Sequence, residues 1–537
     1  MNFNNFKYIL PVAAITLTAG LSSCVGDLDV TPIDPSTTMA VDEAGLYTKC
    51  YANMALAGNG GANGDCDIDG LDGGTTGFVR QLWNANELTT DEAICGWGDP
   101  GIPQFNYNTW DASHPMLQGF YYRLYSGINY CNHYLDVCAG INATREAEVR
   151  FLRALYYYYL MDCYGNVPFT TAVSAESPMQ IMRADLFKWI ESEVKLAAAN
   201  MLEPAARTSA TEGYGRADQD AANLLLARMY LNAEVYTGEA RWADAKTYAE
   251  KVIAGPHKLW TTGANGWSAY QMLFMGDNGE NGASQEAILP LLQDGITTTS
   301  WGTTLFLMAS SWKDDMDTNG DYGTKEFWAG NRARSQLIKK FFPNVTDAKE
   351  IAYTISDMAA AAGDSRALFY GIDREFVPTN PSEFTSGISV GKFRNTYSTG
   401  ANGHNSQFID ADYFLMRAAE AYLIAAEADL REDGSLSDTG LGYINALRSR
   451  AGAKTVAKED CTLDYILDER SRELYYEGFR RTDLIRYGYY GGDNGKYLWD
   501  WKGGVLSGQA FAAERNLFAI PAEDINANPN LKQNSGY

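Results

Sequence analysis

One pentapeptide of this 537-residue chain fits the pattern around a hydrolase nucleophile. Gly387-Ile388-Ser389-Val390-Gly391 matches G-x-S-x-G. In the fold that uses this turn, an acidic residue and then a histidine must follow the serine along the chain. His404 is the only histidine after Ser389, and neither Asp nor Glu lies between the two. We therefore interpret the segment as a buried strand and turn.

Carboxylates and arginines are concentrated over residues 468–486. A glycoside hydrolase needs a pair of carboxylates, so the abundance of Asp and Glu leaves that activity open. The spacing favours a different interpretation, because Glu477 and Arg481 are four residues apart and Glu469 and Arg472 are three apart. Both spacings place opposite charges side by side on a helix. We expect an ion network on a helix surface.

An acidic, glycine-flexed loop over residues 277–286 has the oxygen ligands that Ca²⁺ prefers. Its candidate ligands are Asp277, Asn278, Glu280 and Gln285. The spacing is not that of an EF-hand, and a solvated acidic turn is the alternative. No other cofactor is expected, because the chain has no H-E-x-x-H motif and the glycine-rich stretch 58–64 lacks the lysine of a P-loop.

Charge and composition exclude some classes of partner. The chain has 43 Lys+Arg against 67 Asp+Glu, a formal net charge of −24. Nucleic-acid binding rewards the opposite balance, so we expect no nucleic-acid partner. Only 4 His are present, which leaves little for a histidine-rich metal site. The 34 Tyr and 12 Trp instead provide amphipathic rings suited to gripping polar ligands.

The N-terminus has the features of a lipoprotein signal. Residues 1–23 contain a short apolar run, and Leu21-Ser22-Ser23-Cys24 resembles a bacterial lipobox. An ordinary secretory signal with a chance cysteine is the alternative. Lipidation of Cys24 would leave residues 24–40 as an acidic, proline-containing tether. No later stretch reaches 18 apolar residues. The seven remaining Cys are an odd number without a CxxC pair, and we interpret most of them as core residues.

Five segments have apolar residues at helical spacing and suggest paired helices. These are residues 146–160, 217–235, 241–253, 413–430 and 440–451. Small Ala and large aromatic residues alternate along them, as in tetratricopeptide-like stacking with an irregular period. Residues 57–77 and 260–403 are instead rich in Gly, Asp and Thr, punctuated by aromatic residues. Long loops of this kind inside a folded protein are often functional.

Several segments resemble the SusD/RagB family of Bacteroidetes outer-membrane glycan-binding lipoproteins. They run from the acidic tether to the C-terminus: 27–32, 148–155, 164–168, 415–428, 469–484 and 520–537. The resemblance implies a mainly α fold in which four tetratricopeptide-like helix pairs pack against a loop-rich ligand face with a few short strands. It also implies one domain over 41–537, with helical parts near 41–56, 115–255 and 410–490 and the ligand face near 57–114 and 260–403.

The resemblance is closer still to the starch-binding member of the family, through residues 86–92, 215–218, 233–238 and 497–504. Local alignment then implies a glycan-binding arc of Arg80, Trp97, Asp99, Trp301 and Trp328. Cys95 falls at a third aromatic position of the arc, so one platform is lost or moved to Trp97. The chemistry fits, because sugar C–H faces stack on aromatic rings and hydroxyl groups need directional partners such as Arg80.

The family implies a non-catalytic receptor for starch or maltooligosaccharides, anchored through Cys24 and facing outward from the outer membrane. It would pass α-glucan to a TonB-dependent transporter of the SusC type. Two alternatives stay open: the same scaffold binding another glycan, such as a host or mucin glycan, and a glycoside hydrolase.

Overall fold

The computed structural model describes residues 41–63, 66–316 and 322–537. The predicted signal peptide, the lipidated Cys24 and the tether 24–40 lie outside these residues. Contacts divide the chain into a unit that ends at Ala44 and a body that spans Gly45–Tyr537. The body is described below. Among the described residues, no helix has the length and apolar character needed to cross a membrane.

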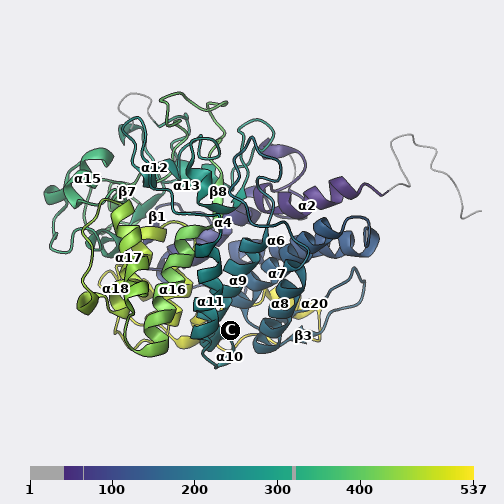
Figure 1. Ribbon diagram of the computed structural model, residues 1–537. Helices are drawn as coiled ribbons and strands as arrows, with labels where there is room; N and C mark the ends of the chain where they lie inside the picture. Colours follow the sequence, from purple (N-terminus) through teal and green to yellow (C-terminus); the bar gives the residue numbers. More distant parts are fainter. Residues whose placement is uncertain (1–40, 64–65, 317–321) are drawn as a thin grey trace, which may run out of the picture. The chain divides into compact units, whose positions relative to one another are not determined.

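Eight helices form the scaffold of the body, and each packs against the next in chain order (Figure 1). They are α6 (Pro115–Val137), α7 (Ala143–Tyr164), α8 (Arg183–Ala198), α9 (Gln219–Leu231), α11 (Trp242–Ala254), α16 (Ala418–Asp433), α17 (Asp438–Arg450) and α18 (Leu463–Leu474). Helices α11 and α16 are adjacent although more than 160 residues separate them in the chain. The predicted mainly α fold with paired helices is confirmed.

Capping residues and one close approach explain how these helices begin and pack. The Asn142 side chain accepts a hydrogen bond from the backbone N–H of Arg145 and caps α7, and Asp218 caps α9 in the same way. Helices α6 and α7 approach closely at Gly127, where an added Cβ would lie 2.4 Å from the ring of Tyr156. A larger residue at Gly127 would therefore push the two helices apart.

Short elements make up the rest of the body. Four strands form an antiparallel sheet in the order β1 (Ala93–Cys95), β5 (Asn331–Ala333), β7 (Ile388–Val390), β6 (Phe369–Tyr370). The other strands form two antiparallel pairs: β2 (Val167–Pro168) with β3 (Gln180–Ile181), and β4 (Ala287–Leu291) with β8 (Tyr413–Arg417). The remaining α-helices are α2 (Glu43–Ala55), α3 (Gly73–Thr76), α4 (Phe78–Trp83), α5 (Ile102–Tyr107), α10 (Ala233–Thr237), α12 (Ala269–Met272), α13 (Thr304–Ala309), α14 (Ser335–Lys339), α15 (Ile355–Ala362), α19 (Arg480–Arg486) and α20 (Ala522–Ala527). Single 3₁₀ turns occur at Gly61–Asn63, Ala283–Gln285, Asp314–Met316, Ala348–Ile351, Lys458–Asp460, Lys502–Gly504 and Ala513–Asn516, and a π-helical turn at Asn84–Leu88.

Two local predictions can be compared with these elements. Ser389 lies in the buried strand β7, where its Oγ accepts a hydrogen bond from Nε of Arg374, so the strand interpretation of the G-x-S-x-G segment is confirmed. The helix predicted over 413–430 is wrong in its first five residues. Tyr413–Arg417 forms β8 and pairs with β4, and the helix begins only at Ala418. All five strand residues are buried, so their pattern has no helical period.

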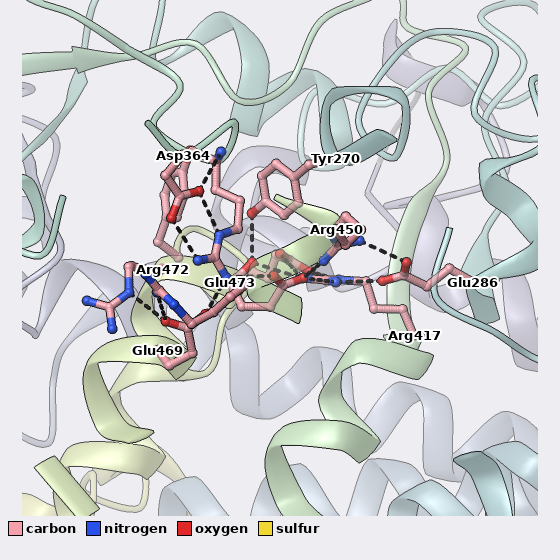
Figure 2. A network of polar contacts seen from close by, with 12 residues as sticks. Tyr270, Glu286, Asp364, Arg417, Arg450, Glu469, Arg472 and Glu473 are labelled. Atoms are coloured by element: carbon pink, nitrogen blue, oxygen red, sulfur yellow. Dashed lines mark hydrogen bonds and ion pairs between the residues drawn. The ribbon is translucent and has the colours of Figure 1, made fainter. Parts of the chain in front are cut away.

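The ion network over 468–486 is real, but its predicted place on a helix surface is wrong (Figure 2). Glu469 and Glu473 are fully buried on α18. The predicted pair Glu469–Arg472 is present at 2.7 Å. The predicted pair Glu477–Arg481 is absent from the described contacts, because α18 ends at Leu474 before Glu477. Arg481 contacts Asp162 instead.

Arginines from several elements neutralise these buried carboxylates. Arg417, at the end of β8, contacts Glu286, Glu473 and Glu477 at 2.6–2.8 Å. Arg450 bridges Glu286 and Glu473, as Figure 2 shows. Buried charge is tolerated only when it is paired and hydrogen-bonded, so these contacts tie β4, β8, α17 and α18 into one unit.

This network makes the stability of the body sensitive to acid. Burial raises the pKa of Glu469, but Arg366 and Arg472 outweigh burial and lower it to about 2. A carboxylate with a depressed pKa stabilises the folded state above its unfolded value of about 4.3. That stability is lost as the pH falls toward about 2. We expect the urea concentration at the midpoint of unfolding to decline from about pH 5 downward. A midpoint that stays constant over pH 5–3 would show that the buried carboxylates do not make the stability acid-sensitive.

The cysteine interpretation is confirmed for most positions. Seven cysteines of the described chain are free, and six of them are buried: Cys50, Cys95, Cys131, Cys138, Cys163 and Cys461.

Candidate functional site

Three indole rings predicted for the glycan arc form a continuous row. Trp97 follows β1, Trp328 precedes β5, and Trp301 lies just before α13. The ring centroids of Trp97 and Trp328 are 6.4 Å apart, and those of Trp328 and Trp301 are 5.9 Å apart. The planes of successive rings differ by 52° and 47°, so the rings do not form a flat sheet. All three side chains are partly exposed.

The backbone pairing of β1 with β5 brings two of these rings together. Cys95 pairs with Asn331, and the N–H of Gly96 donates to the carbonyl of Gly330 at 2.9 Å. Because Trp97 and Trp328 flank this ladder, segments more than 200 residues apart present their rings side by side. Cys95 is fully buried in β1 and cannot be a ligand platform itself.

Each indole N–H of the row is used by the protein. Trp97 donates to the carbonyl of Trp328 at 3.1 Å, and Trp301 donates to the carbonyl of Ala62 at 3.0 Å. Trp328 donates to Oε2 of Glu326 at 2.7 Å. Since every ring is anchored at its polar edge, its orientation is set before a ligand arrives. Such preorganisation lowers the entropic cost of binding.

Arg80 lies next to the row on α4 and has no hydrogen-bond partner for its guanidinium among the described residues. Its guanidinium lies 5.6 Å from the Trp97 ring and 5.1 Å from the ring of Phe306 on α13. Burial lowers the pKa of Arg80, while nearby Asp99 opposes that change. Arginine remains charged in proteins, so the N–H groups of Arg80 other than the buried Nε can donate to hydroxyl groups.

The predicted residue Asp99 lies near Arg80 without a direct contact in the structure. Its side chain is exposed after Trp97, and its backbone carbonyl accepts a hydrogen bond from the N–H of Ile102 at the start of α5. The structure therefore places Asp99 at the rim of the site.

A hollow of about 410 Å³ borders the row at Trp301. The glycine-rich segment that the sequence marked as a functional loop lines it, through Gly61, Gly73 and Gly74. An added Cβ at Gly74 would lie 2.7 Å from Nη1 of Arg80, so the guanidinium lies beside this lining glycine. The hollow thus extends from the Trp301 ring toward the glycines next to Arg80.

Sequence reasoning missed the residues that support the row. Phe408 packs against Trp301 with a centroid distance of 5.0 Å, and Gln407 holds Glu326 through a 2.9 Å hydrogen bond. Both are single residues in a loop without periodicity, and the sequence has no local signal for them. Only the long-range packing of residues 405–410 against the row reveals them.

Buried polar contacts connect the segments that bear Arg80 and Trp97 to the helical scaffold. Asp91 lies just before β1. Arg480 of α19 forms a bidentate contact with it, at 2.7 and 2.9 Å. Glu87 of the π-helical turn accepts hydrogen bonds from the N–H groups of Gly478 and Phe479. These contacts fix α4 and β1, and with them Arg80 and Trp97, to the C-terminal helices.

Gly330 determines where the Trp97 ring lies. An added Cβ at Gly330 would lie 2.3 Å from Cε2 of Trp97, and the glycine has no left-handed backbone that would itself exclude alanine. We expect Gly330→Ala to displace the ring, cost about 1–3 kcal/mol of stability, and alter the near-ultraviolet circular dichroism. Gly98→Ala is the matched control, because an added Cβ there meets nothing within 4 Å. If Gly330→Ala and Gly98→Ala both kept the near-ultraviolet spectrum of the unmodified chain, the Trp97 ring would not pack against Gly330.

Three of the four predicted calcium ligands, Asp277, Asn278 and Glu280, have side-chain hydrogen bonds to the protein, whereas Gln285 takes part through its backbone. Asp277 accepts hydrogen bonds from the backbone N–H and Oγ of Ser398. The Asn278 side chain contacts three backbone groups, which belong to Leu273 and Asp412. In the described parts of the chain, no group of three or more His, Cys, Asp or Glu side chains is arranged to hold a metal. The calcium site stays a prediction.

Comparison with known proteins places the chain in a family. The starch-binding protein SusD of Bacteroides thetaiotaomicron is 38% identical over 572 aligned residues that span 100% of both chains. The chain belongs to the SusD family. The family model described as "SusD family" matches residues 377–537, and one described as "Starch-binding associating with outer membrane" matches residues 70–231. The predicted family resemblance is confirmed.

Solved structures of this family share the fold. A SusD superfamily protein from Parabacteroides distasonis has a TM-score of 0.66 at 20% identity and covers 92% of this chain and 98% of its own. A laminarin-binding SusD-like protein has a TM-score of 0.65 at 20% identity and covers 92% of this chain and 99% of its own. These likenesses establish the architecture of helices and short strands described above.

Proposed function

We propose that this chain is a non-catalytic glycan-binding protein whose ligand lies on the row Trp97–Trp328–Trp301 beside Arg80. The observation that carries the proposal is the row itself: anchored, partly exposed indoles from distant loops, next to a guanidinium without a protein partner. Aromatic faces bind the C–H faces of sugars, and the cation provides directional hydrogen bonds to hydroxyl groups.

Starch or maltooligosaccharide is the ligand we propose. Successive ring planes turn by about 50° along the row, which suits a coiled glucan better than a flat, extended chain. The name of the relative at 38% identity, a starch-binding protein, supports the same choice. The structural relative named for laminarin binding supports the alternative, in which this scaffold binds another glycan.

The lipobox-like segment supports a location for the chain, and the family resemblance supports a partner. We propose that lipidated Cys24 anchors the chain to the outer face of the outer membrane, where it hands glycan to a SusC-like TonB-dependent transporter. The Cys24→Ala variant should lose incorporation of labelled palmitate and leave the membrane fraction. Copurification of a transporter with the wild-type chain tests the partner.

A binding titration tests the ligand. We expect isothermal calorimetry to show binding of soluble amylose and cyclodextrin, and none of xylan or mannan. If the chain binds laminarin or a host glycan more tightly than amylose, the alternative holds, in which this scaffold binds another glycan. Release of reducing sugar from starch by the purified chain would instead support a glycoside hydrolase, and we expect no release.

A further inference from the structure

A second hollow in the body shares no lining residue with the row of indoles or the hollow beside it. It measures about 550 Å³, within the usual size range of ligand sites. One wall is the segment Gly263–Ser268, and the other is the C-terminal end of α15 with Ser365 after it. Trp267 is the only aromatic residue that lines it.

A tight hairpin turn presents Trp267. Asn265 and Gly266 both have positive φ, at 52° and 88°, as a two-residue hairpin turn requires. The turn is closed by reciprocal backbone hydrogen bonds between Ala264 and Trp267 at 3.1 and 2.8 Å. Nδ2 of Asn265 donates to the carbonyl of Ser398 at 2.9 Å, which fixes the tip of the turn. The guanidinium of Arg394 lies 4.7 Å from the Trp267 ring.

Polar groups that line this hollow lack protein partners among the described residues. The indole N–H of Trp267 has none, in contrast to the three indoles of the row. Gln271 uses Oε1 to cap α12 at Ser268, which leaves Nε2 without a partner. Oγ of Ser365 is buried without a hydrogen bond. Small-molecule sites combine apolar and aromatic lining with a few polar groups that orient the ligand, and this hollow has one aromatic ring and three such groups.

The charge of the hollow selects a neutral ligand. Asp364 is the only charged residue that lines it, and both of its oxygens accept hydrogen bonds from Arg366 at 2.8–2.9 Å. We propose that the hollow at Trp267 is a second saccharide-binding site for a neutral oligosaccharide, which stacks on the indole and bonds to Gln271 and Ser365. The proposal rests on the proposed glycan-binding function and adds a second contact point for a long polymer.

Two contact points on one protein would raise the retention of a polymer far above that of a short oligosaccharide. The second binding event is then intramolecular and has a high effective concentration. This predicts that plugging the Trp267 hollow weakens polymer binding while short ligands still bind the row.

Fluorine NMR of the full chain labelled with 5-fluorotryptophan tests the proposal. The resonances of Trp267, Trp301, Trp328 and Trp189 are assigned by Trp→Phe substitution, and Trp189, which packs against Tyr157 and Phe169, is the internal control. Maltoheptaose and laminarihexaose are titrated separately to 10 mM. We expect a saturable shift at Trp267 with at least one ligand, and none at Trp189.

A matched pair of helix variants makes the test specific. Ala360 is exposed on α15 and lines the hollow, whereas its neighbour Ala361 is exposed and does not. Ala360→Leu should fill the space and weaken the affinity measured at Trp267 about 10-fold, and Ala361→Leu should leave it unchanged.

The outcomes separate this inference from the proposed function. A Trp267 resonance that neither ligand moves would overturn the second site, while shifts at Trp301 and Trp328 would still support the row. Shifts at Trp267 alone would support the second site and refute the row as the ligand surface. Equal loss in both leucine variants would also overturn the assignment.

Discussion

The double variant Trp301→Ala, Trp328→Ala is expected to migrate through an amylose-containing native gel without retardation. The two rings are neighbours in the row, with centroids 5.9 Å apart, and both are partly exposed. If burial of each platform by a sugar contributes about 1–2 kcal/mol, loss of both removes about 2–4 kcal/mol. That corresponds to an affinity about 30- to 1,000-fold weaker, measurable by calorimetry with maltoheptaose.

The conservative counterpart separates binding from folding. Trp301→Phe with Trp328→Phe keeps two aromatic faces but loses the N–H bonds to Ala62 and Glu326, so we expect most of the retention to survive. Far-ultraviolet circular dichroism should be unchanged in both double variants, because neither ring belongs to the helical scaffold. Normal retention of a folded double alanine variant would exclude the row as the ligand surface.

The largest loss of stability is expected for Arg417→Ala. Arg417 contacts Glu286, Glu473 and Glu477 at 2.6–2.8 Å, and all of these residues are buried. Removing one partner of a buried network leaves uncompensated charge, at a cost of about 3–5 kcal/mol. The free energy of unfolding, measured by urea denaturation at pH 7, should fall by that amount or the chain should fail to accumulate.

An exposed ion pair serves as the control. Lys458 contacts Asp438 at 2.8 Å with both side chains largely exposed, so Lys458→Ala should change stability by less than about 0.5 kcal/mol. Adding Glu473→Gln to Arg417→Ala should recover part of the loss, because it removes one of the three carboxylates that Arg417 neutralised. If Arg417→Ala is no more damaging than Lys458→Ala, the network does not hold the scaffold together.

Periodicity predicted the helices well where one face is apolar and the other is polar. It failed at Tyr413–Arg417, where every residue is buried and a strand and a helix look alike in sequence. It also failed at Glu477, because α18 ends three residues earlier and Tyr476 takes a positive φ of 66°. Helical spacing rules do not apply beyond a helix end. Burial of the charges was not predictable, since their partners, such as Asp91, Asp162 and Arg366, lie far away along the chain.

Resemblance to a family identified the candidate site, and the structure gives its geometry. Local spacing could not show that Trp97 and Trp328 meet, because the β1–β5 ladder joins segments more than 200 residues apart. The supports of the row, such as Phe408 and Gln407, depend on the same tertiary contacts. Cys95, which the alignment placed at an aromatic position, proved to be a buried strand residue.

The three-residue ladder between β1 and β5 has a consequence for how chains of this fold can diversify. Because each strand supplies one flank of the same ring surface, the segments 57–114 and 260–403 must be inherited as a matched set. A chimera that swaps only one of them would break the register beneath Trp97 and Trp328. Exchange of both together would transplant the whole ring surface onto an unchanged set of helices, so the loops could vary while the architecture is kept.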